Sequence, residues 1–483
     1  MNIATDHKTI STPICVDLDG TLIKSDMLHE AIFMLVRMNL FYIFLLPLWW
    51  LKGKAHLKAE IAKRVMPDVR GLPYRKELIE WLKTQKKNGR ILVLATATHV
   101  HYANAVAEHL GIFDKVEASD ETTSLSSGAK ADRLVELFGE NGFDYLGNGN
   151  ADIAVWDKAR KAITVGDERA ALVYAKQEHA ERFTQSAPEK STIRIWLKAI
   201  RVHQWLKNSL LFVPVILAFN TLTATSVAAV ILAFISFSLC ASSVYLLNDL
   251  IDIEVDRKHK TKQLRAIPSG QITITQAASV SILLLAISFG LSLFLPLAFT
   301  GILALYYITT CAYSFALKRM LLIDVLTLAG LFTIRVLAGA TAISATVSAW
   351  LLAFSMFFFL SLALVKRFVE VSNQLEDAGR KETGRGYQAV DLETLGQSGI
   401  ASGFAAVVVL ALFVDSPQIA ENYQHPEVIW LVCPLVLYLI IRIWILARRK
   451  HMHDDPVVFL MTDWRSQIMI AAGAILMLIS QMV

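Results

Sequence analysis

Asn248 to Asp256 read Asn-Asp-Leu-Ile-Asp-Ile-Glu-Val-Asp, and this run ends a long apolar stretch that begins near Val227. Asp249, Asp252 and Asp256 are spaced i, i+3 and i+7, so a single helix places their carboxylates on one face. Ionisable groups at the end of a membrane helix are costly and mark functional sites. Mg²⁺ binds carboxylate oxygens while it keeps positions open for phosphate oxygens. The spacing therefore predicts a Mg²⁺–diphosphate site; the alternative is a solvated acidic cap on a loop.

The composition divides the 483-residue chain into two halves. Hydrophobic residues make up 54% of it, and the mean hydropathy is +0.47, a value that soluble proteins seldom reach. Residues 1 to about 190 mix charged and apolar residues as a soluble domain does. From about residue 208, apolar segments dominate, each about as long as a bilayer-spanning helix. The four cysteines are scattered and the net charge is only +5, so we expect neither a disulfide nor a nucleic-acid partner.

The apolar half is predicted to contain about nine transmembrane helices. Their approximate limits are 208–223, 227–248, 274–294, 298–317, 321–341, 347–365, 399–415, 427–447 and 466–483. Lysine and arginine fill alternate loops, whereas the intervening loops have none. By the positive-inside rule, the acidic run and the N-terminal half are cytoplasmic and the C-terminus lies outside. The N-terminus has no signal-peptide core, so we expect the soluble half to stay in the cytosol, and the apolar spans predict a multi-pass inner-membrane protein. The basic, Trp-containing stretch 194–208 suits an interfacial helix.

Four elements follow one another in the N-terminal half. Residues 13–20 form a short apolar run that ends in Asp17 and Asp19, and Ile91 to Thr98 form a second. A helical pattern opens at Lys130, and a third run ends in Gly-Asn-Gly-Asn-Ala-Asp at residues 147–152. Strands that alternate with helices predict a parallel α/β sheet with its site at the carboxyl ends of the strands. We place this domain at residues 1–166, with a polar linker at 167–193.

The residue types at these strand ends suit phosphate-ester hydrolysis. A carboxylate can attack phosphorus, and a second carboxyl two residues later can protonate the leaving group. The order of elements resembles the haloacid dehalogenase-like phosphatases, which implies a Rossmann-like α/β domain with a helical cap. The resemblance implies these roles: Asp17 as nucleophile and Mg²⁺ ligand, Asp19 as acid/base and a further Mg²⁺ ligand, Thr96 as phosphate ligand, Lys130 as the neutralising charge, and Asn148 and Asp152 completing the metal site. Asn148 departs from the family pattern, which has Asp there, so a phosphate-binding domain without activity is the alternative.

Residues 27–70 stand where that family inserts its cap. Ile32 to Leu51 is unusually apolar and includes Phe44, Trp49 and Trp50, while Pro47 argues against a clean membrane span. One interpretation is a buried cap helix. The other is a cap that dips into the membrane surface to meet a lipid-linked substrate.

The second half, residues 194–483, resembles the UbiA superfamily of polyprenyl transferases. The resemblance implies an all-α helical bundle in which an Asp-rich loop binds Mg²⁺-diphosphate at the cytoplasmic face. Aromatic prenyltransferases of this superfamily carry a second D-x-x-x-D motif. Here Asp324 is followed four residues later by Leu328, so the second motif is incomplete.

Four further segments point to one branch of the superfamily. They are 201–208 (RVHQWLKN), 268–270 (PSG), 313–318 (YSFALK) and 366–370 (KRFVE). Together they resemble the decaprenyl-phosphate 5-phosphoribosyltransferases, which transfer phosphoribose from phosphoribosyl diphosphate (PRPP) to a polyprenyl phosphate. Phosphates need charge-assisted donors, which basic residues supply. The expected substrate-binding residues are Asn248, Arg201, Lys207, Lys262, Arg265, Tyr313, Lys318, Asp324, Lys366 and Arg367.

These resemblances favour a two-step membrane enzyme with Mg²⁺ in both domains. The membrane domain would make a polyprenyl-phosphoryl-5-phosphoribose, and the soluble domain would remove its 5-phosphate. Two alternatives stay open. One is a prenyltransferase that alkylates an aromatic acceptor, and the other treats the soluble domain as a sensor of phosphorylated metabolites.

Overall fold

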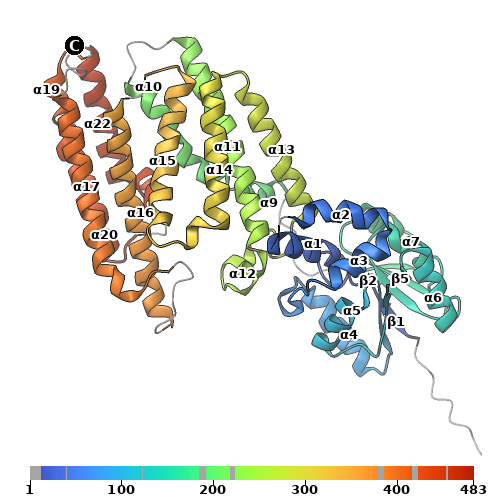
Figure 1. Ribbon diagram of the computed structural model, residues 1–483. Coiled ribbons are helices and arrows are strands. Elements are labelled where there is room, and N and C mark those ends of the chain that lie inside the picture. Colours follow the sequence, from blue (N-terminus) through green and yellow to red (C-terminus); the bar gives the residue numbers. More distant parts are fainter. Residues whose placement is uncertain are drawn as a thin grey trace, which may run out of the picture. The chain divides into compact units, whose positions relative to one another are not determined.

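The computed structural model divides the chain into two compact units, which are described separately (Figure 1). Unit 1 comprises Met1–Ala199 with Leu246–Ser279, and unit 2 comprises Ile200–Tyr245 with Val280–Val483. The structure describes residues 12–39, 41–121, 123–183, 192–217, 223–346, 348–378, 386–415, 423–452 and 455–482. Residues 184–191 of the expected linker lie outside this set.

Unit 1 is built on a six-stranded parallel sheet in the order β3-β2-β1-β4-β5-β6, which confirms the predicted parallel α/β architecture. The strands are β1 (Ile14–Val16), β2 (Leu92–His99), β3 (Lys115–Ser119), β4 (Asp144–Gly147), β5 (Lys161–Val165) and β6 (Ala180–Phe183). Cys15 pairs with Val93 of β2 and with Tyr145 of β4. The three residues of β1 have no exposed surface, as expected of a central parallel strand.

Alternation along the strands separates two cores. Ile14 and Val16 belong to a core that includes α4 (Lys76–Lys87) and α5 (Val100–Leu110). Cys15 belongs to the other core, which includes α6 (Gly128–Phe138), α7 (Ile153–Trp156) and α8 (Arg169–Tyr174). Because successive side chains of a strand point to opposite faces, helices cover both faces of the sheet.

The sheet continues beyond residue 166, where the sequence analysis ended the domain. α8 and β6 fall within the stretch that was expected to be a linker. β6 pairs with β5 through a register that matches Val165 with Phe183. Polar composition alone suggested a linker, because β6 is an edge strand whose two central residues are exposed.

The cap consists of α1 (Met27–Met38), α2 (Tyr42–Leu51), α3 (Lys54–Ala62) and the 3₁₀ turn η1 (Val69–Gly71). Asp26 caps α1 by accepting hydrogen bonds from the backbone N–H groups of Leu28 and His29. Met27 and Leu35 of α1 are buried in the same core as β1. The cap helices therefore lie within the range predicted for them.

Unit 1 also contains the acidic run. α11 (Ala224–Ile251) ends there, α12 (Ile253–Lys258) and the turn η5 (Lys262–Leu264) follow, and α13 (Ile274–Ser292) begins. Asp252 stands between α11 and α12 with non-helical backbone angles, so the three aspartates do not lie on one uninterrupted helix. α9 (Thr192–Ala199) covers only the first part of the stretch 194–208 that was expected to form one interfacial helix, and the turn η3 (Val202–Phe212) follows it.

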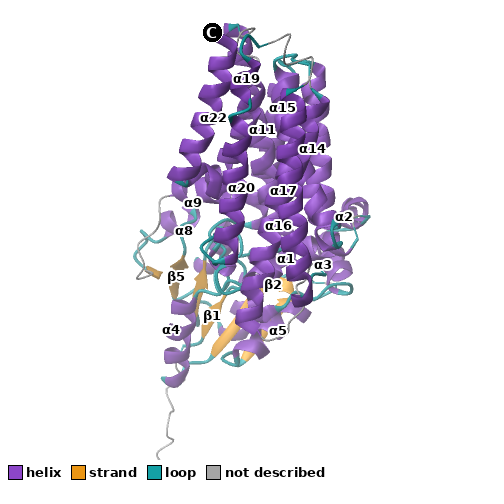
Figure 2. Ribbon diagram, turned by 90° about the vertical axis from the view of Figure 1, so that its left-hand side faces the viewer, coloured by secondary structure: helices purple, strands orange, loops and turns teal. Residues whose placement is uncertain are grey.

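Unit 2 is all helical, and its long helices run side by side (Figure 2). After the turn η3 (Val202–Phe212) and α10 (Val213–Leu217), it contains α14 (Leu297–Phe315), η6 (Leu317–Arg319), α15 (Ile323–Ala342), α16 (Ala349–Ala378), η7 (Ala389–Asp391), α17 (Leu392–Val414), α19 (Pro426–Ile429), α20 (Val432–Arg448), α21 (Pro456–Thr462) and α22 (Trp464–Met482). α14 packs on α15, α15 on α16, α16 on α17, and α17 on α20. At Gly399 of α17 a Cβ atom would lie 2.0 Å from the Trp444 ring, so only glycine permits this close approach.

Seven of the described helices are long and apolar enough to cross a membrane, and the prediction of nine is not confirmed. The seven spans are Ala224–Ile251, Ile274–Ser292, Leu297–Phe315, Ile323–Ala342, Ala349–Asn373, Ala389–Val414 and Pro426–Arg448. The first predicted span, 208–223, contains instead the end of η3 and the short α10. The last, 466–483, overlaps α22, which is not among the seven.

Candidate functional site

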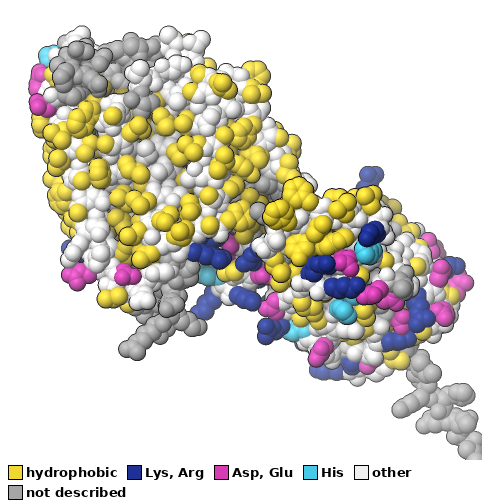
Figure 3. Space-filling model, viewed as in Figure 1, with side chains coloured by type: hydrophobic (Ala, Val, Ile, Leu, Met, Phe, Trp, Pro, Cys, Tyr) yellow, Lys and Arg dark blue, Asp and Glu magenta, His cyan; other side chains and the backbone are white. Residues whose placement is uncertain are grey.

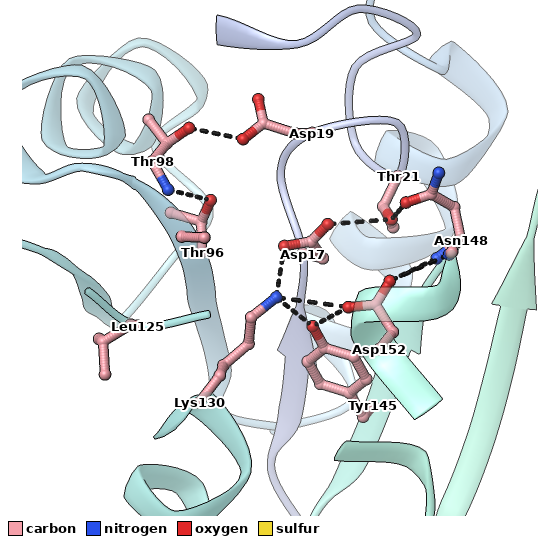
Figure 4. Close-up of polar contacts among 12 residues, drawn as sticks. Asp17, Asp19, Thr21, Thr96, Thr98, Leu125, Lys130, Tyr145, Asn148 and Asp152 are labelled. Atoms are coloured by element: carbon pink, nitrogen blue, oxygen red, sulfur yellow. Dashed lines mark hydrogen bonds and ion pairs between the residues drawn. The ribbon is translucent and has the colours of Figure 1, made fainter. Parts of the chain in front are cut away.

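A buried polar network lies at the carboxyl ends of the central strands of unit 1 (Figure 4). Lys130 Nζ donates hydrogen bonds to Asp17 Oδ1 at 2.8 Å, to Tyr145 Oη at 2.7 Å and to Asp152 Oδ1 at 3.3 Å. Tyr145 Oη donates to Asp152 Oδ1 at 2.7 Å. One ammonium therefore joins two carboxylates that the sequence places 135 residues apart.

The fold explains why these residues meet. Asp17 directly follows β1, and Tyr145 lies on the adjacent β4. Asp152 ends the turn η2 (Asn150–Asp152) after β4, and its Oδ2 accepts from the backbone N–H groups of Asn148 and Gly149. Both oxygens of Asp152 are thus used by protein donors, which fixes this side chain.

Burial changes the protonation of the two N-terminal aspartates. Burial raises the pKa of Asp17 to about 7, an effect that Lys130 opposes and Asp152 reinforces. Burial, together with Asp26 and Asp17, raises the pKa of Asp19 to about 8. A carboxyl that keeps its proton near neutral pH can act as a general acid, which is the role predicted for Asp19.

Asp19 points away from the lysine network. Its Oδ2 accepts a hydrogen bond from Thr98 Oγ1 at 2.5 Å, and its Oδ1 accepts from the backbone N–H of Met27 at 2.8 Å. Thr96, the predicted phosphate ligand, is fully buried, and its hydroxyl accepts from the Thr98 backbone N–H. Thr98, which the sequence analysis did not single out, therefore contacts the predicted general acid through its hydroxyl.

Asn148 is held in one orientation by two neighbours. Its Oδ1 accepts from Thr21 Oγ1 at 3.1 Å, and its Nδ2 donates to Glu168 Oε1 at 2.6 Å. The amide carbonyl therefore faces Thr21 and the Asp17 side. Gly20, with φ +75°, makes room for this amide, since a Cβ atom there would lie 2.3 Å from Asn148 Nδ2.

The oxygen atoms around Asp17 meet only part of what Mg²⁺ requires of its ligands. Among the described residues, no group of three His, Cys, Asp or Glu side chains is arranged to hold a metal ion. Two oxygens nevertheless converge, because Thr21 Oγ1 lies 3.5 Å from Asp17 Oδ2 and 3.1 Å from Asn148 Oδ1. Carboxylate and amide oxygens are the ligands that hard cations prefer. Asp17 and Asn148 therefore fit such an ion. Asp152, which was predicted to be a ligand, binds Lys130, Tyr145 and backbone N–H groups instead, and Asp19 faces Thr98.

We expect Asn148→Asp to destabilise unit 1 by about 1–3 kcal/mol at neutral pH, because it replaces the donor to Glu168 with a second carboxylate. Burial raises the pKa of Glu168. An acid whose pKa is raised on folding loses its stabilising effect as pH rises through that value. The deficit should therefore grow with pH in thermal melts. Adding Glu168→Gln, which restores a donor, should recover much of it; a deficit unchanged by pH and by the second substitution would contradict this account.

An arginine, Arg265, binds two carboxylates of the acidic run in unit 1. Arg265 Nη1 lies 3.1 Å from Asp249 Oδ1 and 2.6 Å from Asp256 Oδ2. Lys262 lies farther off, with its Nζ 3.9 Å from Asp256 Oδ1. Both aspartates are buried and converge on one positive centre. That convergence is what a divalent cation would require, so these two carboxylates fit Mg²⁺, with Arg265 taking the charge-balancing position.

The same segment contacts the cap through ion pairs within unit 1. Arg257 binds both oxygens of Glu30, at 2.7 and 3.1 Å, and both side chains are buried. Arg37 pairs with Glu254 at 3.2 Å. Sequence reasoning missed these pairs, because nothing in either segment identifies a partner more than two hundred residues away.

In unit 2, the basic residues of the entry motif are partly buried. Lys207 forms an ion pair with Asp455, and burial lowers the pKa of this lysine. Lys207 and Lys366 outweigh the effect of burial on Asp455 and hold its pKa below the ordinary value. Arg201 lies over the Tyr245 ring at 4.9 Å. Tyr313 lies on α14 and Lys318 in η6.

Asp324 and Arg367, both predicted to bind substrate, form an ion pair with each other. Arg367 Nη2 lies 2.7 Å from Asp324 Oδ2, and Tyr387 Oη donates to Asp324 Oδ1 at 2.5 Å. Asp324 has no exposed surface and Arg367 only 1%. The structure therefore places them in a buried link between α15 and α16 and leaves no accessible atom on Asp324.

Arg335 of α15 is a buried cation that the sequence analysis did not consider. Its Nε donates to Asn208 Oδ1 at 3.0 Å and its Nη2 to Tyr306 Oη at 3.2 Å. Phe237 and Phe332 also lie beside the guanidinium. Within the part of the chain that the structure describes, no carboxylate forms an ion pair with it. A charged group that deep in a helical bundle is a functional signal, and its position inside an apolar span could have revealed it.

The model of the UbiA prenyltransferase family matches residues 209–464. An uncharacterised protein of Sinorhizobium fredii is 38% identical over 93% of this chain and 87% of its own length. The chain belongs to the UbiA prenyltransferase family. The decaprenyl-phosphate phosphoribosyltransferase of Mycolicibacterium smegmatis is 34% identical over 38% of this UbiA-family chain, which covers 60% of that enzyme, less than two thirds.

Two solved structures align with part of this chain. A UbiA homologue from Archaeoglobus fulgidus bound to GPP and Mg²⁺ aligns with 60% of this chain and all of its own, with 17% identity and a TM-score of 0.46. A HAD family hydrolase from Salmonella enterica aligns with 35% of this chain and 66% of its own, with 13% identity and a TM-score of 0.28. The UbiA match contains the acidic run, whereas Arg201, Lys207 and the whole parallel sheet precede it.

Proposed function

We propose that this UbiA-family protein transfers 5-phosphoribose from PRPP to a polyprenyl phosphate, and that its N-terminal domain then hydrolyses the 5-phosphate of the lipid product. The observation that carries the first step is the convergence of Asp249 and Asp256 on one cation position. Two further supports are family membership and the similarity to phosphoribosyltransferases that act on decaprenyl phosphate. Mg²⁺ bound there would neutralise the departing diphosphate.

The alternative, alkylation of an aromatic acceptor by a prenyl diphosphate, finds less support. That chemistry would use a second acidic motif beginning at Asp324. Here the Asp324 carboxylate is paired with Arg367 and Tyr387 and is buried. Both partners of that pair are buried, so separating them to admit a metal is strongly unfavourable, whereas the Arg265 side chain that pairs with Asp249 and Asp256 is 34% exposed and can move away from them.

The hydrolytic step is supported by the Asp17–Lys130 network. Asp17 would attack phosphorus with its carboxylate, and Lys130 would balance the charge that develops. Asp19 would give its proton to the leaving oxygen and later take one from water. Mg²⁺ held by Asp17 and Asn148 would polarise the phosphate. The substrate is a phosphate monoester, which is what the proposed first step produces.

The test is a reconstitution with purified full-length protein. Radiolabelled PRPP and decaprenyl phosphate should give a phosphoribosylated lipid and, with time, its dephosphorylated form, both identified by mass spectrometry. A parallel reaction with geranyl diphosphate and an aromatic acid should give no alkylated product. Alkylation without phosphoribosyl transfer would refute the proposal in favour of the alternative.

The α2 helix of the cap has an exposed apolar face, which suits a phosphatase site that must bind a lipid-linked substrate. Phe44 is 72% exposed and Trp50 62%, and Leu48 and Leu51 of the same helix are also exposed. Figure 3 shows hydrophobic side chains on this face of unit 1. Trp49, by contrast, is buried in the core. We propose that this exposed apolar face contacts the membrane surface, since large apolar side chains rimmed by lysine favour that interface.

A fluorophore attached to a cysteine at position 44 should report this contact in nanodiscs. Brominated lipids should quench it strongly, because quenching requires contact with acyl chains. A matched label at position 83, on the exposed side of α4, should be unaffected. Equal behaviour of the two labels would show that α2 is covered by protein or by water instead.

A further inference from the structure

A second lysine, on the cap, lies near the phosphatase-like site. Lys58 lies on α3, and its Nζ donates a hydrogen bond to the carbonyl oxygen of Ala97. Ala97 stands between Thr96 and Thr98 at the end of β2, and Thr98 in turn binds Asp19. Lys58 is therefore placed beside the predicted general acid.

The ammonium of Lys58 has carboxyl groups nearby, but its hydrogen bond goes to a backbone carbonyl. Burial lowers its pKa, while the nearby carboxylates of Asp19 and Asp26 act in the opposite direction. Among the described residues, Lys58 forms no ion pair at salt-bridge distance. The backbone carbonyl uses one of three ammonium donors, so the side chain can still bind an anion. Lys130, in contrast, is fully engaged by Asp17, Tyr145 and Asp152.

The position defines which part of a substrate Lys58 would meet. In the proposed hydrolysis Asp17 attacks phosphorus and Asp19 protonates the oxygen that leaves. A cation on the Asp19 side therefore lies next to the leaving group, not the transferred phosphate. A cation that is partly desolvated favours a leaving group that carries its own negative charge.

We propose that Lys58 is a specificity-determining residue that selects phosphate monoesters whose leaving group bears a second anionic group, such as a second phosphate on the same sugar. This inference rests on the proposed phosphatase function. The proposed lipid product meets the requirement, because its ribose carries a phosphodiester as well as the 5-phosphate. The reaction is hydrolysis in two steps. An Asp17 oxygen bonds to phosphorus as the ester P–O bond breaks, and the leaving alkoxide receives the Asp19 proton; water, losing a proton to Asp19, then bonds to phosphorus as the Asp17–phosphate bond breaks and inorganic phosphate leaves.

The experiment compares ribose 1,5-bisphosphate with ribose 5-phosphate as substrates of the full-length protein. The wild type should prefer the bisphosphate in kcat/KM. Lys58→Met should lower kcat/KM for the bisphosphate by about 10- to 100-fold, the effect of one charge-assisted hydrogen bond, and for ribose 5-phosphate by less than about threefold. Lys58→Arg should keep most of the preference. Lys63→Met, an exposed lysine that follows the same helix, should match the wild type.

The outcomes separate this inference from the function on which it rests. Hydrolysis of neither ester by a folded wild-type protein would reject the phosphatase function itself. Hydrolysis of both esters, with equal losses on Lys58→Met, would show that Lys58 acts through Asp19 and would overturn the specificity role. Equal preference for both esters in the wild type would overturn it as well. Thermal melts of each variant confirm that it is folded.

Discussion

Asp17→Asn should abolish the hydrolytic step and leave phosphoribosyl transfer intact, so that the 5-phosphorylated lipid accumulates. The amide keeps the shape of the side chain but cannot attack phosphorus. Loss of a nucleophile of this kind lowers turnover by at least about a thousandfold. The measurement is the ratio of the two lipid products by mass spectrometry after reaction with PRPP and decaprenyl phosphate.

Asp132→Asn is the matched control for this prediction. Asp132 is an exposed carboxylate on α6, two residues from Lys130, so it tests the loss of one charge near the site without touching the network. Its product ratio should equal that of the wild type. If the dephosphorylated lipid still forms with Asp17→Asn, the N-terminal domain does not catalyse the second step, whatever the fate of the first.

Asp249→Asn and Asp256→Asn should each reduce phosphoribosyl transfer by at least about a hundredfold, because each removes one of two carboxylates that converge on the cation position. Each variant leaves Arg265 with one remaining carboxylate. The loss should therefore be accompanied by weaker binding of Mn²⁺, measured by electron paramagnetic resonance with and without diphosphate. That second readout separates a metal-binding defect from a general loss of activity.

Glu254→Gln provides the control within the same segment. Glu254 is acidic and near in sequence, but its carboxylate pairs with Arg37 and not with Arg265. It should keep its Mn²⁺ affinity. Near-wild-type transfer by Asp249→Asn or Asp256→Asn would remove the basis for a metal site here and leave Arg265 as a purely structural counter-ion.

The part of the site that follows from strand order could be predicted from the sequence. Asp17 ends a central strand, and Asp152 follows the neighbouring one, so any parallel sheet of this order brings them to the same edge. Lys130 could be predicted only through a family resemblance, since the start of a helix does not fix where a lysine points. The parallel sheet could be predicted because the central strands β1 and β2 are largely apolar runs, whereas the edge strand β6, with its exposed central residues, could not.

Contacts that depend on tertiary packing could not be predicted. Glu168 binds Asn148 only because β5 lies beside β4, and the predicted domain ended two residues before it. Lys58 reaches Ala97 only through the orientation of a cap helix. The spacing of the three aspartates assumed one helix, whereas the chain breaks at Asp252 and Arg265 completes the cluster.

In the membrane half, too, some features could be predicted from the sequence and others could not. Hydropathy located the long apolar helices, but it also counted residues 208–223 as a span. Residues up to Phe212 form a long 3₁₀ turn, whose tighter geometry is uncommon over such a length. Hydropathy measures apolar content and not hydrogen-bond pattern, so it could not distinguish the two.

The buried pair between Glu30 and Arg257 also bears on how the protein is made. A ribosome releases the last strand of the sheet, β6, well before it reaches Arg257, and α11 must be synthesised in between. At ordinary elongation rates this interval lasts roughly several seconds, far longer than a small sheet needs to collapse. Throughout that time Glu30 is without its cation and must stay hydrated. The cap therefore reaches its final packing only after α11 has been translated, which makes the last folding step of the α/β domain depend on a segment that follows a long apolar helix.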